Sequence, residues 1–572
     1  MPLPMRPLMP NRRNAFIIFF FVTLLVTGVL SYHEIGCDDH WWHVATGRLI
    51  RAEMRVPDVD VFSFTYAGSS WHNHEWGFSL FISLVWDYAG PVGFFLYRWL
   101  VLFGIVAFLW GAVREHRVRA GASPPSLSFS FSLLFFILLV IQIRIAIRPH
   151  LLGYLFLSGL VWRLQRPLVW KDRWLLLGQS LLFFAAWSFF HYSWVLGVVA
   201  VVTTIGDRYL RWKWGDGIRF LKDMLRLARQ YRWRVIAISS SLLILMTLLL
   251  FYGPLSFVLS HFFVLDNNEW KSYLYWLSLH PFFAVTIPYY LLLILFSLRI
   301  IRTEPFYGFL VFIVAILPFR SSRFMTEFLI ISLPIMIHYL SEFLFDRDLR
   351  LLRRIPVVML NAILAVALAE STVLMYRDWG VGVSTTKNPV WLADFMEEKG
   401  LAGNLYATNL SFHAYFMFRS WPEIKVFFDG RDMQVYPVYF IKDYLSLSFS
   451  EIVTKYPVDY IVKDIAISGL DRHDAEFLAA APSPYELVYF DQHWALFMKE
   501  EVIARYPAIR SFRMLYPINL ASERLMRQVV ERGNLPILRG ELAHYLTLVR
   551  QPEQQQLYDL MRAEIAKYGP VD

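Results

Sequence analysis

Long apolar runs, separated by short charged segments, dominate the first two thirds of the chain. A helix that crosses the hydrocarbon core of a bilayer, about 30 Å thick, needs roughly 20 apolar residues. Eleven runs reach or approach this length, namely residues 15–32, 93–112, 127–143, 150–162, 174–190, 193–206, 235–252, 281–298, 305–318, 324–338 and 355–372. The pattern therefore predicts about eleven transmembrane helices within residues 1–376.

The composition agrees with a membrane protein. Of the 572 residues, 57% are hydrophobic, 17% aromatic and 18% charged, and the mean hydropathy is +0.43. A soluble domain is typically about 45–50% apolar and about 25% charged. The single cysteine, Cys37, excludes an internal disulfide and any multi-cysteine metal site.

The net charge of +9 does not indicate a nucleic-acid partner once it is divided by region. Residues 1–376 hold 34 Lys and Arg against 21 Asp and Glu, whereas residues 377–572 hold 21 against 25. The basic excess belongs to the membrane part, where Lys and Arg favour cytoplasmic loops.

The distribution of these charges between alternate loops predicts the orientation. With the N-terminus inside, the inner loops hold 25 Lys and Arg and the outer loops before residue 377 hold 8. The first apolar run lacks a convincing cleavage site and is interpreted as an uncleaved anchor. We expect a multi-pass protein of the cytoplasmic (inner) membrane, with a cytoplasmic N-terminus, a long first outer loop at 31–92 and a periplasmic or otherwise extracytoplasmic C-terminal domain.

Residues 377–500 alternate β-rich runs with helix-like stretches, which indicates an extracytoplasmic α/β domain. The expected strands are 404–407, 424–428, 460–463 and 486–490, and the expected helices are 391–399, 437–447 and 450–456. Residues 501–572 are predicted to form a charged helical appendix, with helices at 522–531 and 555–567.

The first outer loop is dense in ionisable and aromatic side chains. Its tryptophans, Trp41, Trp42, Trp71, Trp76 and Trp86, suit a membrane interface. Carboxylates pressed against such side chains lose hydration, which raises their pKa and makes them candidate proton acceptors. This loop therefore offers a candidate base.

Within this loop, Asp39 and His43 are four residues apart and would share one helix face. Together with His74 and Glu75 they are candidate ligands of a divalent cation. Acid–base catalysis or ordinary hydrogen bonding explains the same residues equally well. The sequence contains no zinc-protease, phosphate-loop or nucleophile-elbow motif.

Cations on the predicted outer side run against the orientation rule. They are Arg144, Arg148, Lys271, Arg320 and Arg323, and each lies in an outer loop or at the outer end of a span. Such side chains can extend to lipid headgroups. Two closely spaced arginine pairs are also suited to bidentate binding of a phosphate or diphosphate.

The same segments resemble bacterial polytopic proteins of the type C (GT-C) glycosyltransferase superfamily, which includes protein O-mannosyltransferases and oligosaccharyltransferases. The likeness rests on Asp39-His40-Trp41-Trp42-His43, Gly47, Pro57, Asp60-Val61-Phe62-Ser63, Trp71-His72-Asn73-His74-Glu75-Trp76, Arg148-Pro149-His150, His191, Glu269-Trp270, Arg320, Arg323-Phe324 and Phe428-Asp429-Gly430-Arg431. These positions span most of residues 30–435. Gly77 departs from the pattern, which has leucine there.

The resemblance implies transfer of a sugar from a polyprenyl-phosphate donor at the outer leaflet, with a first-loop aspartate as catalytic base. Asp39 matches that position, and Asp38 precedes it as an alternative. We expect an inverting glycosyltransferase in which His43 and Glu75 assist this base and the outer cations bind the donor phosphate. Acceptor contacts or other roles are expected for His40, His74, His191, Glu269, Asp429 and Arg431. The expected partners are the lipid-linked donor, membrane lipids and a glycan, lipid or protein acceptor.

Asp429, Gly430 and Arg431 follow a predicted strand, at the end where α/β sheets tend to place ligand sites. The alternative is a turn with Gly430 at positive φ and an exposed Asp–Arg pair of little energetic value.

A non-catalytic transporter or membrane scaffold is the alternative function. Transporters commonly place ionisable residues near the bilayer midplane and contain inverted repeats. The sequence shows no such repeat, and Glu327 and Glu370 are the residues that would favour a transporter if they lined a midplane cavity.

Overall fold

The computed structural model describes residues 10–570 apart from 167–172, 215–271, several positions within 273–285, and 346–353, 376–377, 432–433, 448, 466–484 and 517–522. The chain forms two compact units. The membrane unit comprises residues 1–34 and 74–382, and the second unit comprises residues 35–73 and 383–572. The sequence analysis assigned all of 31–92 to the membrane part, whereas residues 35–73 fold with the C-terminal domain.

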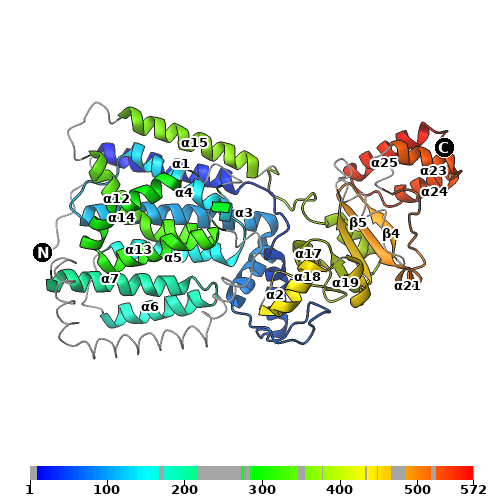
Figure 1. Ribbon diagram of the computed structural model, residues 1–572, viewed down its shortest axis with the longest axis horizontal. Coiled ribbons are helices and arrows are strands. Elements are labelled where there is room, and N and C mark those ends of the chain that lie inside the picture. Colours follow the sequence, from blue (N-terminus) through cyan, green and yellow to red (C-terminus); the bar gives the residue numbers. More distant parts are fainter. Residues whose placement is uncertain are drawn as a thin grey trace. The chain divides into compact units, whose positions relative to one another are not determined.

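The membrane unit is a bundle of helices (Figure 1). Its described helices are α1 (Pro10–Ser31), α3 (Trp76–Arg119), α4 (Leu127–Ile141), α5 (Pro149–Gln165), α6 (Arg173–Ser188), α7 (Trp194–Trp214), α12 (Ile287–Thr303), α13 (Pro305–Arg320), α14 (Met325–Phe345) and α15 (Arg354–Met375). Every predicted span except 235–252 falls on one of them. That run lies outside the described residues, so the count of about eleven stays a prediction.

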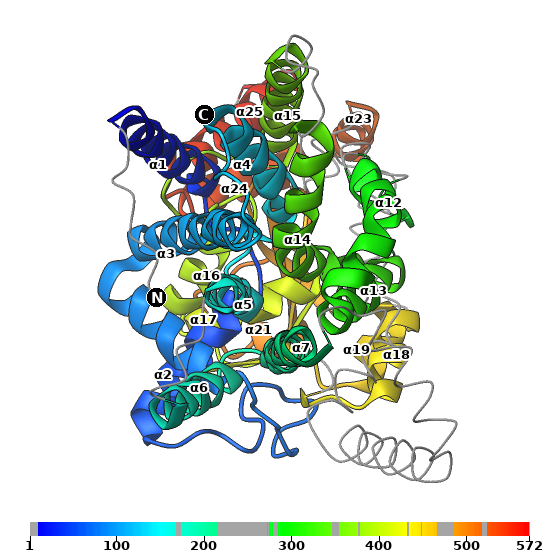
Figure 2. The same cartoon turned by 90° about the vertical axis from the view of Figure 1, so that its left-hand side faces the viewer.

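Four described segments are long and apolar enough to cross a membrane, namely Asn14–Ser31, Trp76–Arg119, Ser322–Ser341 and Val357–Leu374. Helices α4 and α13 are shorter apolar helices. Helix α5 packs against α3, α7 and α14, and the view in Figure 2 shows it among these three. The middle of the bundle is therefore built from helices that are far apart in the sequence.

Helix α3 begins earlier than the sequence analysis expected. The expected loop ran to residue 92, but residues from Trp76 onward are helical. Phe78, Ser79, Ile82 and Ser83 are buried at the three- and four-residue spacing of one helix face. Non-helical angles at Gly90 (φ 53°, ψ −140°), just before Pro91, interrupt the helix, which agrees with a predicted span that begins only at residue 93.

Helices α4 and α15 are joined by side-chain hydrogen bonds. The Ser132 hydroxyl donates to Asn361 Oδ1 (2.6 Å), and Gln142 Nε2 donates to the Ser371 hydroxyl (2.6 Å). In an apolar environment such bonds contribute to helix association, at about 0.6 kcal/mol each on average.

The second unit is built on a five-stranded sheet of order β2-β1-β3-β5-β4. The strands are β1 (Gly403–Ala407), β2 (Ile424–Val426), β3 (Tyr460–Asp464), β4 (Tyr485–Phe490) and β5 (Trp494–Lys499). Strand β1 pairs in parallel with β2 and β3, whereas β5 pairs antiparallel with β3 and β4. The four expected strands are present, and the sequence analysis missed β5.

The helices of this domain follow the expected alternation. They are α16 (Val390–Glu398), α17 (Leu410–Ser420), α18 (Val438–Ser446) and α19 (Phe449–Lys455). The C-terminal residues add α21 (Glu500–Ile503), α23 (Glu523–Glu531), α24 (Leu535–Leu546) and α25 (Pro552–Ala566). The rings of Phe490 in β4 and Tyr545 in α24 are 4.9 Å apart, so the appendix packs on the domain instead of standing apart from it.

The segment 35–73 extends the edge of this sheet. The backbone of Ser63 bridges to Val426 in β2, and Phe64 N donates to the Val426 carbonyl (3.0 Å) while Val426 N donates to the Phe62 carbonyl (3.1 Å). The segment also contains α2 (His40–Glu53), which packs on α17. There Trp41 stacks on Phe418 with ring centroids 4.5 Å apart.

Candidate functional site

A cluster of ionisable side chains forms at one end of the membrane unit, around the turn 189–193 between α6 and α7. Two glycines in neighbouring helices allow those helices to pack closely against this turn. A Cβ on Gly77 of α3 would lie 2.9 Å from the Phe189 carbonyl oxygen, and a Cβ on Gly153 of α5 would collide with the Ser193 hydroxyl. The glycine at position 77, where the resembling proteins have leucine, thus allows the turn to approach α3.

His191 lies in the middle of this cluster. Its Nδ1 is 2.9 Å from the Ser193 hydroxyl, and the charges of Glu75, His74, Arg323 and Arg144 all act on it. Burial is the main cause that lowers the pKa of His191 to about 4. The imidazole is therefore neutral at physiological pH and offers one donor and one acceptor nitrogen.

His74 and Glu75 lie beside that turn. The His74 ring stacks on Tyr192, with centroids 4.1 Å apart. His74 Nε2 is 3.6 Å from Glu75 Oε1, and the two side chains are only 8% and 14% exposed. Both ionisable groups are therefore largely shielded from water.

Three of the five predicted donor-site cations lie around His150, at this end of the bundle. Arg144 ends a 3-10 turn after α4, Arg148 is the N-cap residue of α5, and Arg323 lies in the turn before α14. The charges of all three act on His150, whose Nε2 lies 3.2 Å from the Arg144 carbonyl oxygen. The turns at the ends of three helices thus bring together arginines up to 179 residues apart in the numbering.

Tyr154 and Glu327 complete this cluster, and the sequence analysis did not select Tyr154. Arg144 is hydrogen bonded to the Tyr154 side chain, and the charges of Glu327 and Arg323 act on the same tyrosine. Tyr154 is one helical turn beyond His150, a spacing that could have identified it.

The other predicted residues of the membrane part have different outcomes. Arg320 ends α13. Lys271 and Glu269 lie outside the described residues. Glu327 is in the first turn of α14, whereas Glu370 is exposed on α15.

Asp38 and Asp39 belong to the second unit, where Asp39 is the N-cap residue of α2. The Asp39 side chain is half-buried and makes no capping hydrogen bond to the helix, although Asp38 Oδ1 accepts from the Asp39 N–H (2.8 Å). Burial raises the pKa of the neighbouring Cys37 thiol, and the charges of both carboxylates raise it further. The two carboxylates thus lie close together at the start of α2.

His40 and His43 lie on the interior side of α2. They are 3% and 1% exposed, and the His43 ring stacks on Trp42 at 3.5 Å between centroids. Trp41, Trp42 and Trp71 are also buried within this unit. Placing these three tryptophans at a membrane interface was therefore wrong.

Asp429 and Arg431 form a buried network with a residue of the first loop. Arg431 Nε and Nη2 donate to the two oxygens of Asp429 at 2.7 and 2.6 Å, and Arg431 Nη1 lies 2.7 Å from Asp60 Oδ1. The Tyr436 hydroxyl also donates to Asp429 (2.6 Å). Burial alone would raise the pKa of Asp429, but the guanidinium of Arg431 offsets this and holds the pKa below its ordinary value.

This network corrects two expectations. Both side chains are fully buried, so they have no surface to offer an acceptor, and the alternative of an exposed pair is wrong as well. Gly430 is not among the described glycines with positive φ. Asp60 belongs to a segment that carries the family resemblance, but no local pattern in the sequence indicates its partner 371 residues later.

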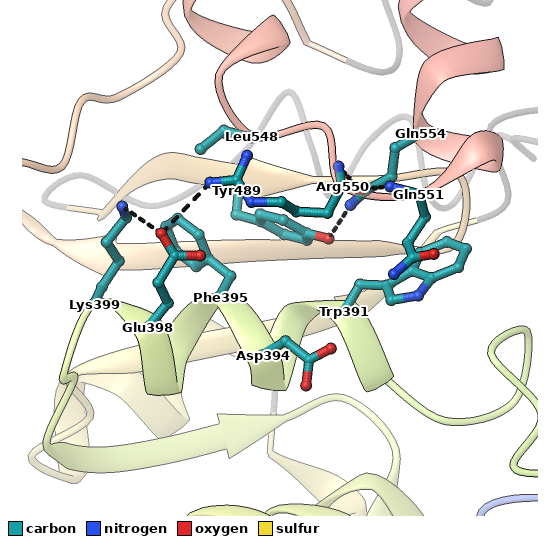
Figure 3. Close-up of a pocket in the computed structure, with 10 residues that line it drawn as sticks. All are labelled: Trp391, Asp394, Phe395, Glu398, Lys399, Tyr489, Leu548, Arg550, Gln551 and Gln554. Carbon is teal, nitrogen blue, oxygen red and sulfur yellow. Dashed lines mark hydrogen bonds and ion pairs between the residues drawn. The ribbon is translucent and has the colours of Figure 1, made fainter.

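A small pocket of about 50 Å³ lies elsewhere in this unit, between α16, β4 and the segment before α25 (Figure 3). Glu398 at its rim pairs with Lys399 (3.3 Å) and Arg550 (3.5 Å), and Gln554 Nε2 donates to the Tyr489 hydroxyl (2.9 Å). None of the predicted site residues lines this pocket. Its polar contacts attach the C-terminal helices to the domain.

No family model and no curated protein matches the chain. Among solved structures, ArnT from Cupriavidus metallidurans bound to undecaprenyl phosphate is 13% identical, with a TM-score of 0.47 over 85% of this chain and 98% of ArnT. The apo oligosaccharyltransferase of Archaeoglobus fulgidus is 11% identical, with a TM-score of 0.50 over 82% of this chain and 73% of its own.

The oligosaccharyltransferase, for which the TM-score reaches 0.50, is a GT-C glycosyltransferase. The fold is GT-C-like. The resemblance noticed in the sequence is thereby confirmed at the level of the fold. One fold of this kind supports many reactions, and the side chains at its functional site determine which one takes place.

The predicted metal ligands are divided between the two units of this GT-C-like chain. Asp39 and His43 lie in the second unit, whereas His74 and Glu75 lie in the membrane unit. Within the part of the chain that the structure describes, no group of three or more His, Cys, Asp or Glu side chains is arranged to hold a metal ion. The divalent cation stays a hypothesis.

Proposed function

We propose that this chain is a membrane-embedded glycosyltransferase that moves a sugar from a polyprenyl-phosphate donor to an acceptor at the outer face of the cytoplasmic membrane. The observation that carries the proposal is the convergence of Arg144, Arg148 and Arg323 on His150 at one end of a GT-C-like helical bundle. Arginine forks bind phosphate oxygens in bidentate fashion, and their charge persists at any physiological pH.

The arginine cluster would bind the donor phosphate and stabilise it as it leaves. When the bond between the anomeric carbon and the phosphate oxygen breaks, the electron pair remains on that oxygen as additional negative charge. Preorganised cations close to developing charge are usually the largest single contribution to catalysis. The neutral imidazole of His191 and the phenol of Tyr154 add hydrogen-bonding groups to the same cluster.

Asp39 would act as the general base. In this mechanism its carboxylate takes the proton of the acceptor hydroxyl while the hydroxyl oxygen forms the new bond to the anomeric carbon, with inversion. The half-buried position of this side chain at the start of α2 supports the role. General-base assistance typically contributes about 10²–10⁴-fold in rate.

The base is tested by Asp39→Asn, because the amide keeps the shape of the side chain but cannot accept the proton. The experiment compares surface glycans and lipid-linked sugars, by mass spectrometry, in a deletion strain and in strains that carry each variant. We expect the deletion strain to lack one glycan modification and to accumulate its lipid-linked donor. Wild type should restore the modification, whereas Asp39→Asn should not.

Asp38→Asn is the matched control for this experiment, since it removes the neighbouring carboxylate and should restore the glycan. Restoration by Asp39→Asn would exclude Asp39 as the base. A deletion strain with unchanged glycans and unchanged lipid-linked sugars would contradict the proposed reaction itself.

The donor site is tested by Arg148→Lys and Arg323→Lys, with undecaprenyl phosphate in detergent micelles as the probe. Lysine keeps the charge but loses the bidentate fork, so we expect roughly tenfold weaker binding, equivalent to about 1.4 kcal/mol. Arg302→Lys, at an exposed position on α12, should bind as wild type does. Wild-type affinity in the two cluster variants would favour simple headgroup contact, because lysine extends to headgroups equally well.

A further inference from the structure

The backbone of Gly430 lies so close to the side chain of the proposed base that a larger residue at this position would require that side chain to shift. A Cβ at this position would lie well within 3.0 Å of Asp39 Oδ1, and 3.3 Å from both Asp39 Cγ and Trp42 Nε1. Trp42 is 2% exposed, and its Nε1 has no hydrogen-bond partner among the described contacts. The loop Asp429-Gly430-Arg431 therefore lies against both the Asp39 carboxylate and the Trp42 indole at the start of α2.

This loop is held by the two residues that flank Gly430. Arg431 joins the Asp429 carboxylate to that of Asp60, with N–O distances of 2.6 to 2.7 Å on both sides. Asp60 in turn accepts hydrogen bonds from Phe62 N (3.0 Å) and from the backbone and hydroxyl of Ser63. The Arg431 guanidinium also lies 4.6 Å from the centre of the Trp71 ring. Gly430 is thus held between two fully buried charged side chains whose partners lie on both segments of this unit.

A base needs this kind of support. The Asp39 side chain makes no capping hydrogen bond with α2, so contacts other than the cap set the orientation of its carboxylate. The backbone of Gly430 excludes those conformations of Asp39 in which the carboxylate would point towards the loop. Misplacement of a reacting group by about 1 Å can reduce the rate about 100-fold.

We propose that Gly430, held by the buried Asp60–Arg431–Asp429 network, is a positioning residue that orients the carboxylate of Asp39. This inference rests on the proposed function for its catalytic meaning, but the contact itself can be tested without activity. It also gives the Asp429-Gly430-Arg431 stretch a role that does not require contact with the acceptor.

The variant that tests this inference is Gly430→Ala. Gly430 does not have positive φ, so alanine changes only the space between this loop and the side chains of Asp39 and Trp42. We expect glycan restoration in the deletion strain to be about 100-fold slower at matched protein levels. Binding of undecaprenyl phosphate by the purified variant should stay within twofold of wild type, which a general loss of fold would not allow.

Gly540→Ala is the matched control, because a Cβ on this glycine of α24 meets no atom within 4 Å. It should restore the glycan at the wild-type rate. A Gly430→Ala variant that restores the glycan at the wild-type rate, while Asp39→Asn does not, would overturn the inference.

A stability cycle tests the contact even where Gly430→Ala folds poorly. In the Asp39→Ala background the nearest atoms to the new methyl group are gone, so Gly430→Ala should lower the melting temperature much less than it does in wild type. Equal losses in both backgrounds would overturn the inference. Failure of the proposed function has a different signature, namely an active Asp39→Asn variant or a wild type that does not bind undecaprenyl phosphate.

Discussion

The guanidinium of Arg431 is a charge held entirely inside the second unit. Taking such a group out of water costs several kcal/mol, and the cost is offset only if its partners are well placed. Here two carboxylates from distant parts of the chain satisfy it, Asp60 on one side and Asp429 on the other. The charge is therefore tolerable only when both segments are in position.

Asp60→Ala should consequently destabilise the protein by about 3–5 kcal/mol, because it leaves part of a buried guanidinium unpaired. The measurement is the free energy of unfolding in detergent, followed by tryptophan fluorescence against denaturant. Asp58→Ala is the control, since Asp58 is 79% exposed and lies 3.8 Å from Arg55. It should change the stability by less than about 0.5 kcal/mol. Equal effects of the two substitutions would argue against a structural role for the network.

Among the secondary-structure elements, those with a strong local pattern were predicted and those defined by distant contacts were not. Strands β1 to β4 carry apolar β-rich runs and were expected, whereas β5 begins directly after the turn at Asp491 and was missed. The first half of α3 was taken for a loop because Gly90 and Pro91 interrupt the apolar run. The spacing of apolar residues indicates which face of a helix or strand is buried, but it defines the ends of that element much less well.

The approach of α5 to the turn 189–193 gives a test at this scale. Gly153→Ala should destabilise the protein by about 1–3 kcal/mol, because its methyl group would collide with the Ser193 hydroxyl and would lie 3.1 Å from His191 Nδ1. Gly178→Ala in α6 has no atom within 4 Å of its Cβ. It should instead stabilise its helix by about 0.5–1 kcal/mol. Melting temperatures in detergent should therefore shift in opposite directions, and shifts of the same sign would contradict the close packing.

For the membrane unit as a whole, polar clusters form at both ends of the bundle. One end holds the arginine cluster around His150 and His191. At the opposite ends of α3 and α5, Arg119 pairs with Glu304 (2.9 Å) and His116 lies 3.0 Å from Gln165 Oε1. These two groups of segments are those that the charge pattern assigns to the outer and inner sides. The sequence therefore predicted which loops lie at the same end of the bundle, because successive helices cross the same apolar layer in opposite directions.

The orientation of the bundle is a separate prediction that rests on the 25 to 8 distribution of Lys and Arg. In a Cys37→Ser background, single cysteines at the exposed positions Ser123 and Ala504 report on the two sides. A membrane-impermeant maleimide applied to spheroplasts should label Ala504→Cys and leave Ser123→Cys unmodified until the membrane is disrupted. The reverse labelling would contradict the orientation and the outer-face reaction together.

What the sequence could not reveal is the partnership between the first loop and the C-terminal domain. The residues that carry the family resemblance were visible, including Asp39, Asp60 and Arg431. Their assembly depends on contacts between positions more than 350 residues apart, for which neither periodicity nor local composition leaves a trace. The candidate base was therefore found from the sequence, while the glycine that contacts it was read only as part of a turn.

The second unit is assembled from two pieces of chain, and this has a consequence for biosynthesis. Residues 35–73 leave the ribosome soon after α1, but their sheet partners at 383–572 come roughly 300 residues later, a delay of about 15–60 s at about 5–20 residues per second. During that time Trp41, Phe62 and Trp71, all 2% exposed or less in the finished protein, have no domain to pack against. The nascent chain must carry an unfinished core until synthesis of the bundle is complete. On the predicted orientation this segment waits outside the membrane, where we expect it to be bound by extracytoplasmic chaperones.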